Sequence, residues 1–280
     1  MLPLWLLIVL LIIVVLLALL VIFISISSVT VTFRLKEGKP LQEINLAEME
    51  RLKRGPFTIY FPSGHRSLAE EVLSVLEQAW RIARERFAID LGRFGVALVV
   101  PKEGEDLGGV VLNRKIWALW DQIWPVLTSP GLQSLHYADR DTHIFVYWGM
   151  AHEATEMKIA KKLYRDPQAR WVGDGLADYV GCRITSELAP NVRDEMLASR
   201  RKGIQVLLDQ GRRSYDLTQE FPVKFRVRKG KDTELSKQEP KGLTADPGYS
   251  VALAFWLKIA QQHGEGVIKE FWQRLSKQGF

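Results

Sequence analysis

The sequence predicts an α+β domain that follows one N-terminal transmembrane helix. Two observations support this prediction. The 21 residues from Leu4 to Ile24 are all apolar, and the first charged side chain is Arg34; about 20 apolar residues are enough for a helix to cross a bilayer. Further along the chain, strand-like segments come first and helix-like segments come later, as in α+β folds. We therefore predict a transmembrane anchor over residues 1–27.

The flanks of the apolar run indicate how the anchor is used. No Lys or Arg precedes the run, and it is longer than the apolar region of about 7–15 residues in a cleaved signal peptide. We therefore expect an uncleaved anchor whose partner is the lipid bilayer, through residues 4–24. Basic side chains follow the run, beginning with Arg34, Lys36 and Lys39. The positive-inside rule favours a cytoplasmic domain, and an anchor that exports the domain is the alternative.

Residues 28–54 are predicted to form a juxtamembrane stalk, and residues 55–280 the domain. Five apolar side chains in the stalk have the spacing of a short amphipathic helix: Leu41, Ile44, Leu46, Met49 and Leu52. The domain opens with a strand over Pro56–Phe61, which is rich in aromatic and β-branched residues. A helix introduced by the capping box of Ser67 and Glu70 follows.

Later segments complete the predicted strands and helices. Phe94–Val100 and Thr142–Trp148 alternate as strands. Three tryptophans before Pro125 have helical spacing and would pack in the core or, alternatively, face lipid or substrate: Trp117, Trp120 and Trp124. Helices are expected over Met150–Tyr164 and Asp246–Gly264.

The charge and cysteine content limit the classes of function. The chain has 38 Lys and Arg against 32 Asp and Glu, a net charge of +6, but no basic run is dense, so we expect no nucleic-acid partner. The single Cys182 excludes an internal disulfide and a cysteine-based zinc site. It has no paired base and is expected to be a small buried residue.

The segment from His152 to Glu156 is the most informative for function. These two residues stand at i and i+4 and share one helix face, which continues through the apolar Ile159 and Leu163. We expect both side chains to point inward, where a carboxylate needs a cation or hydrogen-bond donors to offset its desolvation. A metal ion would meet that need, and Glu153, about 100° around the helix, could contact a water on the ion. A solvated face with local salt bridges is the plain alternative.

A second pair of acidic residues, Asp174 and Asp178, shares a face on the next predicted helix. The short connection between the two helices lets them pack antiparallel. An acidic side chain of the second helix can then reach the face of His152 and Glu156. Three ligands from two helices with an open fourth position are the layout of a catalytic zinc site.

The two helices together resemble those of gluzincin metallopeptidases, in particular the bacterial peptidase MA-like group related to thermolysin and the alanyl aminopeptidases. That family carries His-Glu-x-x-His on one helix and Trp-x-x-Glu-Gly-x-Ala-x-Tyr on the next. Trp171–Tyr179 matches the second motif except that Asp174 replaces Glu. The resemblance covers about residues 55–280 and implies a zincin-like fold at a bacterial inner or plasma membrane. It also implies a peptide or protein substrate, whose backbone would bind along an edge strand at Thr142–Trp148.

The resemblance implies roles for individual residues. His152, Glu156 and Asp174 would bind the metal, and Glu153 would be the base that activates water. Tyr249 opens a helix similar to a later helix of the family and would donate to the oxyanion.

The chain departs from the family at two of the three ligand positions. Glu156 stands for the second His and Asp174 for Glu. Two carboxylates cancel the charge of a divalent ion and make it a weaker Lewis acid. We expect Zn²⁺, with Mn²⁺ or another divalent ion more competitive at this oxygen-rich site. Three outcomes stay open: an active peptidase, a metal-binding protein with weak activity, and a module without metal that binds a peptide, protein or membrane partner.

Other residues are weaker candidates. His136 and His143 flank the third predicted strand and could substitute as ligands, although a surface or edge-strand histidine is the plainer interpretation. Asp178 could replace Asp174 as a ligand, but it matches a family position that assists the ligands.

Overall fold

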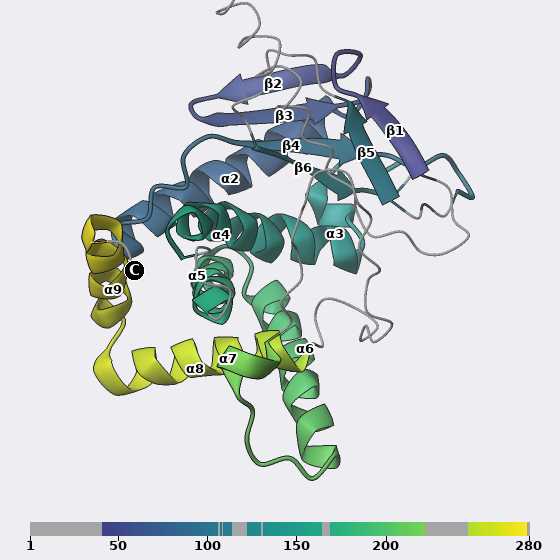
Figure 1. Cartoon of the computed structure of the whole chain (residues 1–280). Helices are drawn as coiled ribbons and strands as arrows, with labels where there is room; N and C mark the ends of the chain where they lie inside the picture. Colours follow the sequence, from purple (N-terminus) through teal and green to yellow (C-terminus); the bar gives the residue numbers. More distant parts are fainter. Residues whose placement is uncertain are drawn as a thin grey trace, which may run out of the picture. The chain divides into compact units, whose positions relative to one another are not determined.

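The computed structural model describes residues 41–105, 107, 109–113, 122–129, 131–163, 169–221 and 246–278. This part of the chain contains a small mixed sheet, a two-stranded sheet and mostly helices (Figure 1), which confirms the α+β class. The anchor predicted at residues 4–24 lies outside these ranges and stays a prediction. None of the helices within them has both the length and the apolar composition that a bilayer crossing requires.

Contacts within the chain divide it into two compact units. The first unit consists of the residues up to Ala69 and Arg93–Gln133. The second unit consists of Glu70–Gly92 and the residues from Ser134 onward. The described strands belong to the first unit, and nearly all described helical residues to the second. All of the predicted site residues fall in the second unit.

The first unit is built on a four-stranded sheet of order β2-β3-β4-β6. Its strands are β2 (Glu50–Arg54), β3 (Phe57–Phe61), β4 (Phe94–Val99) and β6 (Gln122–Leu127). β2 runs antiparallel to β3, whereas β3–β4 and β4–β6 are parallel pairs in which Ile59 lies opposite Val96 and Val96 opposite Trp124. Both faces of β3 and β4 are buried, as is typical of parallel strands with near-continuous apolar sequences.

The two edge strands carry residues that suit an edge. β2 exposes its charged side chains, which discourage pairing with another chain. β6 contains Pro125, which lacks the N–H group that an interior strand needs. The helix expected around Trp124 is therefore wrong at that residue, and Trp117 and Trp120 lie outside the described residues.

A second, two-stranded parallel sheet joins β1 (Leu41–Asn45) to β5 (Gly109–Asn113). Leu46 and Leu112 are buried in one core cluster with residues of the four-stranded sheet. The amphipathic helix expected in the stalk is thus wrong, because residues 41–45 and 50–54 form strands of this unit. β1 pairs with β5, which lies far from it in the sequence, and β2 pairs with β3. The spacing of apolar residues along one segment does not reveal such pairing.

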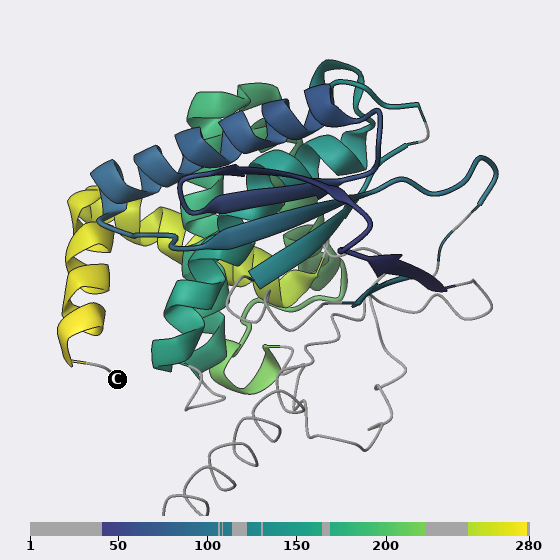
Figure 2. The ribbon, with the colours of Figure 1, turned by 90° about the horizontal axis from the view of Figure 1, so that it is seen from above.

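The second unit is an assembly of helices. These are α2 (Arg66–Phe87, from Glu70 on), α4 (Met150–Leu163), α5 (Arg170–Leu188), α6 (Pro190–Asp209), α7 (Leu217–Glu220), α8 (Pro247–His263) and α9 (Gly266–Gln278), with shorter turns before α4. α5 packs against α4 and α8, while α6 and α9 also pack against α8 (Figures 1 and 2). α4 and α8 confirm the two predicted helices. At the start of α8, Asp246 Oδ1 accepts the N–H of Gly248 at 2.8 Å, and Pro247 takes the first helical position.

The third strand expected over Thr142–Trp148 is wrong, because this segment is helical. α3 (Arg140–Ile144) and the π-helix η3 (Phe145–Gly149) lead without a break into α4. Asp139 Oδ1 accepts the N–H of Thr142 at 2.8 Å and caps this helical run. A short, largely buried apolar run cannot be assigned to strand or helix by its periodicity alone. Residues 142–148 therefore provide no edge strand for a substrate backbone.

α4 and α5 pack closely, and residues 148 and 152 lie beside residues 181 and 178, which is the antiparallel order that the sequence predicts. A Cβ added to Gly181 of α5 would lie 3.2 Å from the carbonyl oxygen of Trp148 and 3.5 Å from the backbone nitrogen of His152. One turn earlier in α5, Asp178 contacts the side chain of His152. The absence of a side chain at Gly181 thus lets the two backbones approach.

α5 approaches α8 in the same way at Gly175. A Cβ added there would lie 2.9 Å from Ala252 Cβ and 3.0 Å from the Ala252 carbonyl oxygen. Because the backbone of α8 would have to move, we expect Gly175→Ala to lower the free energy of unfolding by about 1–3 kcal/mol. Denaturation of the full chain in detergent measures this. Gly266→Ala, whose added Cβ meets nothing within 4 Å, is the matched control; equal stability of both variants would contradict the tight contact.

Candidate metal centre

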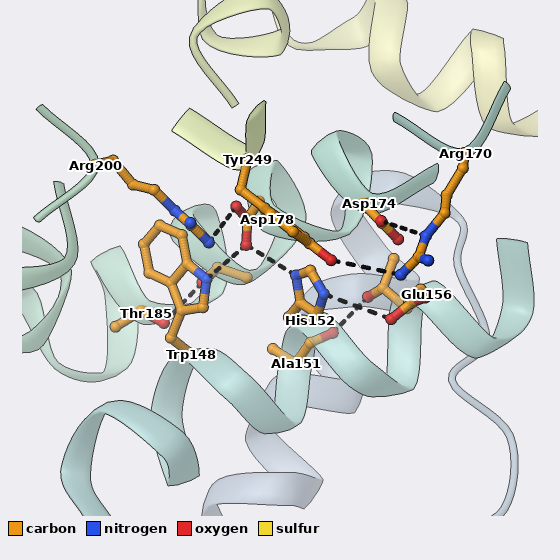
Figure 3. Close-up of polar contacts among 12 residues, drawn as sticks. Trp148, Ala151, His152, Glu156, Arg170, Asp174, Asp178, Thr185, Arg200 and Tyr249 are labelled. Atoms are coloured by element: carbon orange, nitrogen blue, oxygen red, sulfur yellow. Dashed lines mark hydrogen bonds and ion pairs between the residues drawn. The ribbon is translucent and has the colours of Figure 1, made fainter. Parts of the chain in front are cut away.

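Three side chains of α4 form what we call the ligand group: His152, Glu153 and Glu156. Each offers one ligand atom, and these atoms lie within 4.8 Å of one another. His152 Nε2 is 3.6 Å from Glu156 Oε2 (Figure 3), as their spacing along the helix predicts. Ligand atoms about 2.0–2.2 Å from one zinc ion lie at most roughly 4.4 Å apart, so small side-chain rotations would let the group surround an ion. One imidazole and two carboxylates fit a divalent cation.

Asp178 of α5 holds His152 from the other side. Its Oδ1 lies 2.8 Å from His152 Nδ1 and accepts the indole N–H of Trp148 at 3.1 Å, while Oδ2 lies 2.6 Å from Arg200 Nη2 of α6 (Figure 3). Asp178 is fully buried. Burial opposes its ionisation, but Arg200 and His152 outweigh burial and hold the pKa of Asp178 below its ordinary value. A charged aspartate therefore fixes the imidazole.

The contact with Asp178 determines which way His152 faces. Because the Nδ1 hydrogen is directed at the Asp178 carboxylate, Nε2 faces Glu156 and is the ring atom that a metal ion would use after displacing its proton. Histidine ligands of metal sites are typically oriented by a carboxylate in this manner. Asp178 therefore has the place of a residue that supports a metal ligand.

The buried charges shift the pKa values of the ligand group. Burial lowers the pKa of His152, but Asp178 and Glu156 raise it by more, so it lies well above its ordinary value. Burial raises the pKa of Glu153 to about 8; His152 opposes this rise and Glu156 reinforces it. A divalent cation at the group would act in the opposite direction, favouring a neutral imidazole and an ionised carboxylate.

Asp174, the third expected ligand, is fully buried and is held by Arg170. Arg170 Nε donates to Asp174 Oδ2 at 3.0 Å across one turn of α5, and Arg170 Nη2 lies 3.5 Å from the hydroxyl of Tyr249 (Figure 3). Among the described residues, the set of ligand atoms within 4.8 Å of one another contains the ligand group but not Asp174. Asp174 therefore lies at the site with its carboxylate paired to the guanidinium of Arg170.

Tyr249 lies in the first turn of α8 and points into the site (Figure 3). The guanidinium carbon of Arg200 lies 5.4 Å from the centre of its ring, within the range of a cation–π contact. Burial and Asp174 raise the pKa of Tyr249, so its hydroxyl keeps its proton at neutral pH. A protonated hydroxyl can donate a hydrogen bond, as its predicted role requires.

Two further residues of the site, Arg170 and Arg200, are not among those predicted from the sequence. Arg170 and Asp174 stand at i and i+4, a spacing that predicts an ion pair. No comparable signal marks Arg200. It is buried although the next residue, Arg201, is exposed, and the two differ only in the helix face on which they lie.

The other histidine and cysteine candidates make separate contacts. His136 is exposed and stacks edge-to-face on Tyr137. His143 lies on α3, where its Nε2 contacts the carbonyl oxygen of Leu135. Cys182 is buried as predicted, and burial raises the pKa of its thiol to about 11. The thiol therefore stays protonated at neutral pH.

No protein-family model matches the chain, and no curated protein matches it. The resemblance of α4 and α5 to gluzincin helices therefore stays a prediction from the sequence. In the structure, Asp178 contacts the ring of His152, whereas Asp174 is paired with Arg170.

Proposed function

We propose that the chain is a membrane-anchored, metal-dependent peptidase, with its anchor at residues 4–24 and its ion at the ligand group. The observation that supports this most strongly is the contact of His152 with Asp178, which leaves Nε2 of the ring facing Glu156. A largely buried imidazole turned in this way beside two carboxylates is typical of a metal ligand and its supporting carboxylate. The peptidase part of the proposal rests on the resemblance of α4 and α5 to gluzincin helices.

The acidic groups at the site leave room for a cation. Among the described residues, two guanidinium groups meet four carboxyl groups there: Arg170 and Arg200, and Glu153, Glu156, Asp174 and Asp178. Without an ion, the raised pKa values of His152 and Glu153 keep a proton on each of these groups and so balance the charge. A divalent ion would take the place of these two protons.

Each residue has a distinct role in the proposed reaction. A bound zinc or manganese ion would supply Lewis-acid polarisation of the substrate carbonyl. His152 and Glu156 would hold the ion, with Asp174 as the third ligand. Glu153 would accept a proton from the attacking water and pass it to the leaving nitrogen. Tyr249 would donate its hydroxyl hydrogen to the carbonyl oxygen as negative charge develops there.

A non-catalytic module is the second candidate, and one contact favours it. In the ion pair of Arg170 and Asp174, the guanidinium faces the carboxylate of the third expected ligand. Part of the negative charge of the site is therefore balanced without a metal. Such a protein would use the same fold to bind a peptide, protein or membrane partner. Metal content separates the two candidates.

Metal analysis of the full-length chain, purified in detergent, tests the proposal. After expression with zinc or with manganese, we expect about one ion per wild-type chain and its loss in His152→Ala, since a site of this kind depends on its imidazole. His263→Ala, at an exposed histidine at the end of α8, should keep the ion. Circular dichroism shows whether each variant is folded. A wild-type chain without stoichiometric ion under either supplement would contradict the enzyme proposal.

A further inference from the structure

Arg170 stands in an unusual place for a cation. It is the first residue of α5, and the positive end of the helix dipole disfavours a cation in the first turn. Its side chain is nonetheless largely buried, with 14% of its surface exposed against 1% for Asp174. The contact with Asp174 therefore compensates for an otherwise unfavourable position.

The same carboxylate is the one that a metal would use. Asp174 Oδ2 accepts the Nε hydrogen of Arg170 at 3.0 Å, and the Tyr249 hydroxyl lies 3.5 Å from the Nη2 atom of the same guanidinium (Figure 3). A guanidinium and a divalent ion on one carboxylate repel each other, and in a site with little solvent this repulsion is weakly screened. Arg170 in its present position therefore weakens the coordination of an ion by Asp174.

We propose that Arg170 competes with the divalent ion for Asp174 and so sets the metal affinity of the site. This inference rests on the metal-binding part of the proposed function. With Arg170 on Asp174, the ion has protein ligands from α4 only. When Arg170 moves away, Asp174 becomes available as a ligand from α5, and the ion then joins the two helices.

Metal titration of four full-length chains tests the competition: wild type, Arg170→Met, Asp174→Asn and the double variant. Affinity for Zn²⁺ is measured in detergent against a chromophoric chelator. We expect Arg170→Met to bind Zn²⁺ about 10–100-fold more tightly than the wild type, the range in which neighbours of metal ligands act. In the Asp174→Asn background the same substitution should have little effect, because the contested carboxylate is gone.

Two further variants keep the test decisive. Arg183→Met removes an arginine of the same helix that contacts Glu265 at 2.7 Å and should leave the affinity unchanged. If Arg170→Met does not fold, Arg170→Gln, which keeps a neutral hydrogen-bond donor, is titrated in its place.

The outcomes separate this inference from the proposed function. If the wild type binds Zn²⁺ and Arg170→Met binds it equally well, the competition is overturned and the metal site survives. An equal gain with and without Asp174 would show a general effect of removing positive charge and would also overturn the competition. If only the Arg170 variant binds, the competition holds and the wild-type metalloenzyme proposal fails. If neither chain binds, both fail.

Discussion

Glutamine in place of Glu153 is expected to reduce peptide hydrolysis by about 10²–10⁴-fold, the usual contribution of a general base, and to leave the bound ion in place. Glutamine has nearly the shape of glutamate but cannot take up a proton from water. Glu153 is intermediate in exposure, and protein surrounds most of its carboxylate. Turnover of a mixed fluorogenic peptide library by the metal-loaded chain gives the rate, and metal analysis of the same sample gives the occupancy.

Two results would change the role of Glu153. Loss of both turnover and metal would make it a ligand, which its place in the ligand group permits. Unchanged turnover would remove it from the reaction. Glu85→Gln, on an exposed part of α2, is the matched control and should keep both the rate and the ion.

Alanine in place of Asp178 is expected to lower the free energy of unfolding by about 3–5 kcal/mol, the usual effect of removing one partner of a buried ion pair. The Arg200 side chain is 8% exposed, and the substitution leaves its guanidinium beside a small cavity. It also removes the acceptor of the His152 Nδ1 hydrogen. Chemical denaturation of the full chain, without added metal, measures the change.

The ion pair of Arg193 and Asp194 provides the control. Its contact is also short, 2.6 Å, but 63% of the Asp194 side chain is exposed, so Asp194→Ala should change stability by less than about 1 kcal/mol. Adding Arg200→Met to Asp178→Ala should recover part of the loss, because the buried charge is then removed. If Asp178→Ala is no more harmful than Asp194→Ala, the buried contacts of Asp178 do not stabilise the fold.

The helices that the sequence predicted correctly have strong local signals. α8 (Pro247–His263) is capped at its start by Asp246 and at its end by Gly264, which has a φ of 79°; each of these signals acts within a few residues. The segments that were predicted wrongly depend on distant partners. Residues 41–45 become a strand by pairing with β5, and residues 142–148 become helical as the beginning of a longer helical run.

The same distinction applies to the candidate site. Residues four apart share a helix face in any α-helix, so the pairing of His152 with Glu156 followed from the sequence. The contact of His152 with Asp178 requires the two helices to pack, and their short connection in the sequence predicts that packing. The positions of Arg170 and Arg200 did not follow, because a long, flexible arginine reaches partners that its place in the sequence does not specify.

Gly181 touches no group that would react, yet it determines how long an acidic side chain at residue 178 can be. The backbone of α5 lies so close to that of η3 and α4 that a single added carbon would come within 3.2 Å of a carbonyl oxygen. An aspartate, with one methylene, bridges the remaining gap to the imidazole of His152 at 2.8 Å. A glutamate would have to fold back or push the helices apart. The choice between the two acids at residue 178 therefore follows from helix spacing.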